Sequence, residues 1–254
     1  MDLQWLNAQV DALNKALNVH NLVFPELQSV EYQAEIPVDM ANVIDHTLLK
    51  PEATYEQVKQ ELELAKGYKF ASVCIHPRYV SLAADILNGT GIKVCTVVGF
   101  PLGSNTTLTK VNEARDALAD GADELDMVLP LGALKSGDYH SVYEDIALVK
   151  AAAGGRIVKV ILETPLLTDE EIVKASLVAK AAQVDFVKTA TGFAGGATVK
   201  AVELMRQSVG LSCGVKASGG IRDRKSVIAF LQAGANRIGT SAGVAIANMS
   251  AGEQ

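Results

Sequence analysis

Short apolar segments alternate with longer amphipathic ones from residue 41 onward, and this alternation limits the possible folds more than any other feature. Eight runs have the β-branched, apolar character of buried strands, and they centre near Val43, Ser72, Thr96, Leu125, Val158, Phe186, Val215 and Ile238. Segments of helical periodicity lie between them, over residues 55–68, 77–87, 107–120, 139–153, 168–182, 198–209 and 224–234. This number of strands and this spacing predict an α/β protein with a (β/α)₈ TIM barrel. A doubly wound open sheet is the alternative, but it usually has fewer strands, and no GxGxxG motif follows the first strand.

The first forty residues lie outside the repeating pattern and predict an N-terminal helical extension. Residues 1–19 form an amphipathic helix whose apolar face carries Leu3, Leu6, Val10, Leu13 and Leu17. Residues 20–40 show little periodicity and are expected to connect this helix to the barrel. We expect the helix to cap one end of the barrel, with a contact to another copy of the chain as the alternative. The predicted domains are therefore 1–40, an N-terminal helix and connector, and 41–254, the catalytic barrel.

Charge and composition exclude several classes of partner. The net charge is −6 and no block of lysine or arginine occurs, so neither nucleic acid nor an anionic membrane is the expected main partner. No apolar run reaches the length of a transmembrane helix, and no basic region followed by an apolar block marks a secretory signal at the N-terminus. The cysteines, Cys74, Cys95 and Cys213, are odd in number and far apart, which predicts reduced thiols in a cytoplasmic protein.

Three lysines interrupt predicted strands that are otherwise apolar. Lys159, Lys188 and Lys216 lie on consecutive predicted strands, so a barrel would direct them toward one interior. A single buried lysine is usually a salt-bridged structural charge, but three buried like charges are costly without a function. A lysine close to other cations in a dry cavity becomes an amine nucleophile that can form an iminium with a carbonyl compound. Asp126, on the fourth predicted strand, is positioned to carry protons for such a reaction.

Glycine- and hydroxyl-rich segments follow the last three predicted strands. They occupy residues 191–192, 218–222 and 239–241, and Arg222 adds a positive charge to the second. Glycines allow backbone N–H groups to approach an anion, and barrels commonly bind phosphate after strands seven and eight, so we expect a phosphate site. Ordinary turn glycines are the alternative. The spacing of His46 and His76 matches no compact metal motif, so we expect no metal and no cofactor.

Nine segments, in order along residues 41–243, resemble the deoxyribose-phosphate aldolase family of class I aldolases. They are IDHTLLKPEAT at 44–54, ASVCIHPRYV at 71–80, VVGFPLG at 97–103, ELDMV at 124–128, GALKSGDY at 132–139, KVILET at 159–164, VKTATGF at 187–193, VKASGGIR at 215–222 and RIGTSAG at 237–243. The resemblance implies a (β/α)₈ lyase that reversibly cleaves 2-deoxy-D-ribose 5-phosphate to D-glyceraldehyde 3-phosphate and acetaldehyde. The implied partners are small sugar phosphates and aldehydes, and a homodimer is compatible with the sequence.

The resemblance also implies roles for individual residues. Lys188 forms the Schiff base, Lys216 keeps its amine nucleophilic, and Asp126 relays protons through water. Lys159 is a supporting active-site lysine, which we expect to lie deeper than Lys188 as a charged partner of Asp126. The implied substrate-binding set is Asp45, Thr47, Cys74, Thr191, Gly192, Gly219, Gly220, Arg222, Gly239 and Ser241.

Three departures from the family pattern bear on the substrate. Ala190 stands where the family usually has serine, Ala242 replaces the second serine of the phosphate segment, and the last residues contain no tyrosine for proton transfer. These changes are expected to alter water beside the nucleophile, remove one hydrogen bond to phosphate and slow reprotonation. They leave open a Schiff-base barrel for another sugar phosphate. A non-catalytic sugar-phosphate sensor would require loss of the nucleophile or its helper, and both are present.

Overall fold

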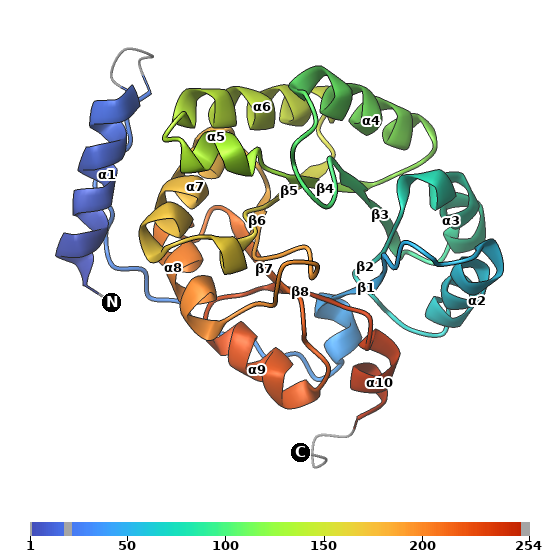
Figure 1. Cartoon of the computed structure of the whole chain (residues 1–254). Helices are drawn as coiled ribbons and strands as arrows, with labels where there is room; N and C mark the ends of the chain where they lie inside the picture. Colours follow the sequence, from blue (N-terminus) through green and yellow to red (C-terminus); the bar gives the residue numbers. More distant parts are fainter. Residues whose placement is uncertain (1, 18–21, 250–254) are drawn as a thin grey trace.

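Eight parallel strands close into a barrel in this computed structural model, which describes residues 2–17 and 22–249 (Figure 1). The strands are β1 (Ile44–Leu48), β2 (Ser72–Ile75), β3 (Lys93–Val98), β4 (Glu124–Val128), β5 (Ile157–Ile161), β6 (Phe186–Lys188), β7 (Gly214–Ser218) and β8 (Arg237–Thr240). Each strand pairs with the next, and β8 pairs with β1. The predicted (β/α)₈ fold is confirmed.

Helices surround the barrel and cover the outer face of its strands (Figure 1). They are α2 (Tyr55–Ala65), α3 (Val80–Leu87), α4 (Thr107–Ala119), α5 (Leu131–Lys135), α6 (Tyr139–Ala152), α7 (Asp169–Ala181), α8 (Val199–Val209), α9 (Arg224–Gln232) and α10 (Gly243–Asn248). In the described part of the chain, three 3₁₀ turns add to these: η2 (Met40–Val43), η3 (Pro77–Tyr79) and η4 (Thr164–Leu166). The helix expected over 77–87 therefore starts as a 3₁₀ turn. Helices α5 and α10 were not predicted because they are too short to show helical periodicity.

Side-chain caps fix where most of the barrel helices begin. Thr54 and Thr168 each accept a hydrogen bond from the N–H of the third helical residue, and Gln57 or Glu171 bonds back to complete a capping box. Further capping side chains are Thr106, Asp138, Thr198 and Asp223. Because such a cap stabilises a helix start by about 1 kcal/mol, these residues also set the length of the loop that precedes each helix.

A buried ion pair joins two of the helices to a strand end. Lys110 of α4 is fully buried, and its Nζ donates to Asp145 Oδ2 of α6 at 2.7 Å and to the Val128 carbonyl at 2.9 Å. Thr107 Oγ1 donates to the other oxygen of Asp145 at 2.8 Å. Burial lowers the pKa of Lys110, and the adjacent Asp145 carboxylate opposes that shift. This pair fixes α4 and α6 against the end of β4.

The N-terminal helix α1 (Leu3–Leu17) lies outside the helical ring, against α6 and α7 (Figure 1). Its buried face carries Leu6, Val10, Leu13 and Leu17, whereas Leu3 is 37% exposed. The expected position over one end of the barrel is wrong, because this face packs on neighbouring helices and not on strand ends. Residues 1, 18 and 19 of the expected helix lie outside the described residues.

The connector runs back along α1 and is held there by two asparagine side chains. Asn14 bonds the backbone of Phe24 in both directions, at 2.9 and 2.7 Å, and Asn7 bonds Leu27 in the same way, at 3.1 and 2.6 Å. Among the described helices, none is long and apolar enough to cross a bilayer.

Leu13→Ala is expected to lower the free energy of unfolding by about 2–5 kcal/mol, because it opens a cavity between α1 and the ring. Leu3→Ala, its matched control on the same helix, should change that energy by less than about 0.5 kcal/mol. Urea unfolding followed by circular dichroism measures both. Equal losses in the two variants would contradict the burial of this face.

Candidate active site

A cavity of about 370 Å³ opens at the carboxyl ends of β1, β6, β7 and β8. Its wall contains Lys188 together with eight of the expected substrate-binding residues: Thr47, Thr191, Gly192, Gly219, Gly220, Arg222, Gly239 and Ser241. Lys188 is only 3% exposed and is the last residue of β6, so its amine lies at the floor of the cavity. The cavity therefore combines one strand lysine with the three glycine- and hydroxyl-rich segments.

Hydroxyl groups join the ends of β6 and β7 beyond the last paired residues. Lys188 and Lys216 are register partners on these strands. Thr189 Oγ1 donates to the Ser218 carbonyl at 3.0 Å and accepts from Ser218 N at 2.9 Å, while Ser218 Oγ donates to the Ala190 carbonyl at 2.6 Å. These bonds fix the two lysine-bearing strands next to each other. These bonds could not be predicted from the sequence, because threonine and serine are ordinary residues at strand ends.

Asp126 binds all three lysines in the interior. Its Oδ1 lies 2.7 Å from Lys159 Nζ, and its Oδ2 lies 2.8 Å from Lys188 Nζ and 2.7 Å from Lys216 Nζ. Burial alone would raise the pKa of Asp126, but the three ammonium groups hold it well below the usual range. The carboxylate is therefore ionised and determines where the three amines lie.

Lys159 lies below the cavity floor, as its position in the strand predicts. The register partner of Lys188 is Ile161, so Lys159 is two residues deeper in the barrel. Besides Asp126, its Nζ contacts Glu124 Oε2 at 2.6 Å and Asp45 Oδ2 at 3.5 Å. Burial alone would lower the pKa of Lys159, yet the surrounding carboxylates raise it well above its usual value. Lys159 is a permanent cation of this network.

Arg237 and Glu124 close the network at the amino ends of the strands. Arg237 Nη1 lies 2.7 Å from Asp45 Oδ1 and 3.3 Å from Glu124 Oε2, and the guanidinium lies over the Phe186 ring at 5.4 Å. Asp45 also pairs with Lys216. Burial opposes ionisation of Asp45, but Lys216, Lys159 and Arg237 together lower its pKa far below the usual value. The expected site contained neither Arg237 nor Glu124, although each is a charge at the first residue of an apolar strand.

The described cluster holds one more positive group than negative groups. Its cations are Lys159, Lys188, Lys216 and Arg237, and its carboxylates are Asp45, Glu124 and Asp126. The charged form of Lys216 is stabilised by its carboxylate partners. Burial alone would lower the pKa of Lys216, but Asp126 and Asp45 raise it. Lys188 is the only one of these seven groups on the cavity wall.

Gly239 makes room for Lys216. A β-carbon at position 239 would lie 2.9 Å from Ser218 Cβ, closer than real contacts allow, and 3.0 Å from Lys216 Cε, which is tighter than most real contacts. Gly192, Gly219 and Gly220 have φ angles of 92°, 95° and 76°, which favour glycine. These glycines shape the cavity wall through their backbone conformation.

Glu163 holds the segment that follows β6. It adopts a left-handed backbone conformation with φ 59° and is 2% exposed. Its carboxylate accepts hydrogen bonds from Thr191 N, at 3.1 Å, and from Thr191 Oγ1. Thr191 Oγ1 in turn accepts from Phe193 N at 3.1 Å. The glycine-rich segment beside Lys188 is thus fixed by a buried carboxylate that sequence reasoning placed only at a strand end.

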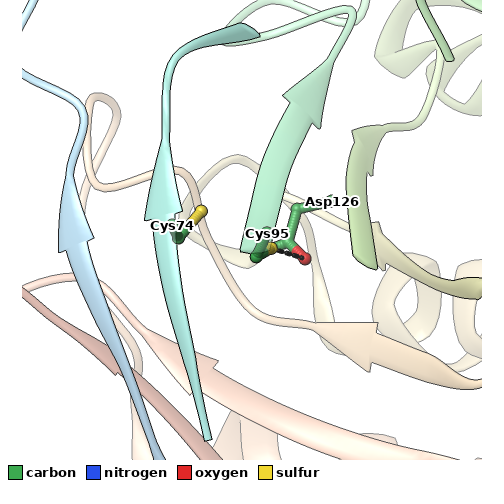
Figure 2. A group of neighbouring side chains, drawn as sticks. All are labelled: Cys74, Cys95 and Asp126. Atoms are coloured by element: carbon green, nitrogen blue, oxygen red, sulfur yellow. Dashed lines mark hydrogen bonds between the residues drawn. The ribbon is translucent and has the colours of Figure 1, made fainter. Parts of the chain in front are cut away.

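Asp45 and Cys74, expected on the pocket wall, are not among the residues that line the cavity, and both are fully buried. Asp45 belongs to the ion network described above. Cys74 lies on β2 beside Cys95 of β3, and the Cys95 thiol donates to Asp126 Oδ1 at 3.2 Å (Figure 2). His46 bonds Glu61 at 2.8 Å and stacks on Phe70, which is a structural arrangement.

Within residues 2–17 and 22–249, two groups of side chains have a spacing that fits a metal ion. They are Cys74, Cys95 and Asp126, and Asp45, Cys95 and Glu124, whose ligand atoms lie within 4.8 Å of one another in each group. Every carboxylate in these groups already pairs with lysine or arginine. A metal ion would have to displace those cations.

A lysine amine at the base of a barrel cavity, held by a carboxylate, fits the class of barrel enzymes that form a Schiff base. The chain belongs to the DeoC/LacD family of aldolases, whose family model matches residues 37–248. It is 57% identical over 206 residues to the deoxyribose-phosphate aldolase of Streptococcus suis, covering 81% of this chain and 94% of that one. The corresponding enzyme of Brevibacillus brevis is 54% identical over 210 residues, covering 82% and 95%. The deoxyribose phosphate aldolase of Aeropyrum pernix, described as tetrameric, superposes with a TM-score of 0.77 at 35% identity, covering 93% and 95%.

Arg237→Met is expected to lower kcat about tenfold or more, because Asp45 and Glu124 lose a buried counter-charge and then draw Lys216 and Lys159 away from their positions on Asp126. Arg237→Lys restores the charge and should recover part of the activity. The measurement is the kcat and KM of each variant across a pH series. Arg156→Met, which removes an exposed arginine, is the control.

A purely structural role for Arg237 makes a different prediction. In that case the two substitutions would reduce activity only in proportion to their loss of folded protein, and the pH profile would not move. That result would remove Arg237 from the positioning network.

Proposed function

We propose that this protein catalyses the reversible retro-aldol cleavage of 2-deoxy-D-ribose 5-phosphate to D-glyceraldehyde 3-phosphate and acetaldehyde, through a Schiff base on Lys188. One observation supports this proposal above the others: the Lys188 amine lies at the floor of the cavity, 2.8 Å from Asp126 and beside the glycine-rich segments. Membership of the aldolase family gives the same reaction class.

The first step forms the covalent intermediate. The free amine of Lys188 attacks the C1 aldehyde of the open-chain sugar, and loss of water leaves an iminium on C1. Asp126 is the proposed relay for the protons that leave the nitrogen and reach the departing oxygen, because it touches the Lys188 amine directly. Lys216 donates a hydrogen bond to the same carboxylate oxygen. It stays charged and holds Asp126 in position beside the Lys188 amine.

The second step breaks the carbon–carbon bond. A base removes the proton of the C3 hydroxyl, the C2–C3 electron pair moves toward the iminium nitrogen, and D-glyceraldehyde 3-phosphate leaves. The remaining enamine takes a proton on C2, and water then hydrolyses the resulting iminium to acetaldehyde and the free lysine. We assign the proton transfers to water exchanging with Asp126.

The phosphate is assigned to the part of the cavity wall that follows β7 and β8. Gly219 and Gly220 allow close approach of backbone N–H groups there, and Ser241 offers a hydroxyl. Arg222 is exposed on the same wall and supplies a positive charge. Asp45 and Cys74 lie behind the residues that line the cavity. They are proposed to affect the substrate indirectly, through the charged groups around Asp126.

Residues 1–40 are proposed as an N-terminal helix and connector attached to a catalytic barrel at 41–254, of which residues 250–254 lie outside the described part. A cytoplasmic location is supported by the three free cysteines. Assembly as a homodimer stays a prediction. Sedimentation of the purified chain measures it, and the tetramer described for the Aeropyrum pernix relative is the alternative outcome.

Treatment with 2-deoxy-D-ribose 5-phosphate and borohydride is expected to add the mass of the reduced sugar intermediate at Lys188, because hydride fixes the imine as a stable secondary amine. Lys188→Met should remove both this adduct and acetaldehyde release. Peptide mass mapping and a coupled acetaldehyde assay measure the two effects. Lys93→Met, an exposed lysine at the opposite end of β3, is the matched control. A fully active Lys188→Met variant would overturn the assignment.

Arg222→Ala is expected to reduce kcat/KM for the phosphorylated sugar about tenfold and to leave that for 2-deoxy-D-ribose nearly unchanged, because only the phosphate meets the guanidinium. The ratio of the two kcat/KM values is the measurement. Arg224→Ala, two residues further and off the cavity wall, is the control. If another sugar phosphate were turned over much faster than 2-deoxy-D-ribose 5-phosphate, the altered pocket around Ala190 and Ala242 would define a different substrate.

A further inference from the structure

We propose that Cys74 and Cys95 are a dithiol modification site, which peroxide converts to a disulfide that reversibly switches off the adjacent aldolase site. The chemical step stands on the geometry of the two thiols alone. Its effect on turnover rests on the proposed function.

The two cysteines already have the placement that a disulfide requires. They are register partners on the parallel strands β2 and β3, and Figure 2 shows them side by side. Neighbouring strands lie about 4.7–4.9 Å apart, within the range of Cα separations of disulfides, about 4.4–6.8 Å. Both sulfurs lie within 4.8 Å of each other and of the Asp126 carboxylate, so both side chains point into the same interior space.

The two thiols differ in reactivity. The contact with Cys95 lowers the pKa of Cys74 despite its burial, whereas burial and the contact with Cys74 raise the pKa of Cys95 well above its usual value. A thiol with a lowered pKa beside a second thiol is the usual arrangement of a reactive pair. Cys74 is therefore the attacking sulfur and Cys95 the resolving one.

The oxidation is balanced with one molecule of hydrogen peroxide. The Cys74 thiolate attacks one peroxide oxygen, the O–O bond breaks, and the leaving hydroxide takes a proton to become water. Cys95 sulfur then attacks the sulfur of the Cys74 sulfenic acid. The S–O bond breaks, and the hydroxide leaves with the Cys95 proton as a second water. Two thiols lose two electrons in total, and the peroxide gains them.

The small apolar cluster that holds the two thiols meets the cavity wall at Leu49. Leu49 lines the cavity wall and belongs to the same small apolar cluster as Cys74 and Cys95, together with Val97. Peroxide is about as small as two water molecules, so a rotation of Leu49 gives it access.

Disulfide formation disturbs the carboxylate on which the lysines depend. In the reduced protein, Cys95 Sγ donates to Asp126 Oδ1 at 3.2 Å and accepts from Lys159 Nζ at 3.3 Å. The disulfide has no proton to donate, and its sulfur must move toward Cys74 to reach bonding distance. Asp126 loses a hydrogen bond, and the lysines on its two oxygens shift with it.

Binding of a divalent metal ion by Cys74, Cys95 and Asp126 is the competing use of these atoms. Three ammonium groups already occupy the Asp126 oxygens, so a dication would enter a region of positive charge. Oxidation removes two thiols without adding a charge. The surroundings therefore favour the disulfide.

The test uses the Cys213→Ala variant, which leaves Cys74 and Cys95 as the remaining thiols. Cys213 lies on neither strand of the pair, and burial raises its pKa to about 11, so its removal simplifies the chemistry. After hydrogen peroxide treatment, the intact mass should fall by two hydrogen atoms, and a non-reducing digest should contain the Cys74–Cys95 crosslink. Acetaldehyde release should fall about tenfold or more and return with dithiothreitol.

The matched variant is Cys213→Ala with Cys95→Ser, compared before and after peroxide with its own untreated sample. It keeps a hydrogen-bond donor beside Asp126 but has no resolving thiol. Peroxide should therefore oxidise Cys74 beyond the sulfenic acid, and dithiothreitol should not restore the lost acetaldehyde release. Failure of the crosslink to form, or a crosslink that leaves turnover unchanged, overturns the proposal. Inactivation that a chelator reverses, and dithiothreitol does not, assigns the site to a metal instead. Because mass detects the crosslink without any substrate, failure of the proposed function would show separately, as an untreated protein that releases no acetaldehyde.

Discussion

The contact of one carboxylate with three ammonium groups determines the rest of the barrel interior. Asp126 brings Lys159, Lys188 and Lys216 to within 2.8 Å of its two oxygens. An isolated buried lysine would destabilise the fold by several kcal/mol, whereas this arrangement lets three strands carry one each. The remaining carboxylates, Asp45 and Glu124, then become necessary as counter-charges. Arg237 becomes necessary in turn, because those two acids are buried at the amino ends of their strands.

The same contact explains why small residues and hydroxyls occupy the neighbouring strand positions. Lys216 extends across the space that a side chain at Gly239 would fill. The ends of β6 and β7 are held by Thr189 and Ser218, since the lysines on these strands must keep a fixed separation. The apolar packing that stabilises most barrels is thus moved outward, to the interface between the strands and the helical ring.

Much of this architecture could be predicted from the sequence, because its signals are local. A window of a few residues is enough to recognise each strand run, each capping threonine and each lysine within β5, β6 and β7. Glu124 and Arg237 were missed because charges at strand starts usually face solvent, and only barrel closure brings β1, β4 and β8 around one interior. Lys110 and Asp145 were missed because charges on amphipathic helices are ordinary. The place of α1 could not be predicted. An apolar face indicates that a helix packs against another part of the protein, but it does not identify that part.

The excess of one cation over the carboxylates has a consequence for the direction in which electrons move. When Lys188 is a free amine, the charges of Lys159, Lys216 and Arg237 match those of Asp45, Glu124 and Asp126. In the proposed reaction, an iminium at Lys188 would add a positive charge that no further carboxylate of this seven-group cluster matches. Drawing the electron pair of the breaking bond onto the nitrogen would cancel that charge and return these seven groups to electroneutrality.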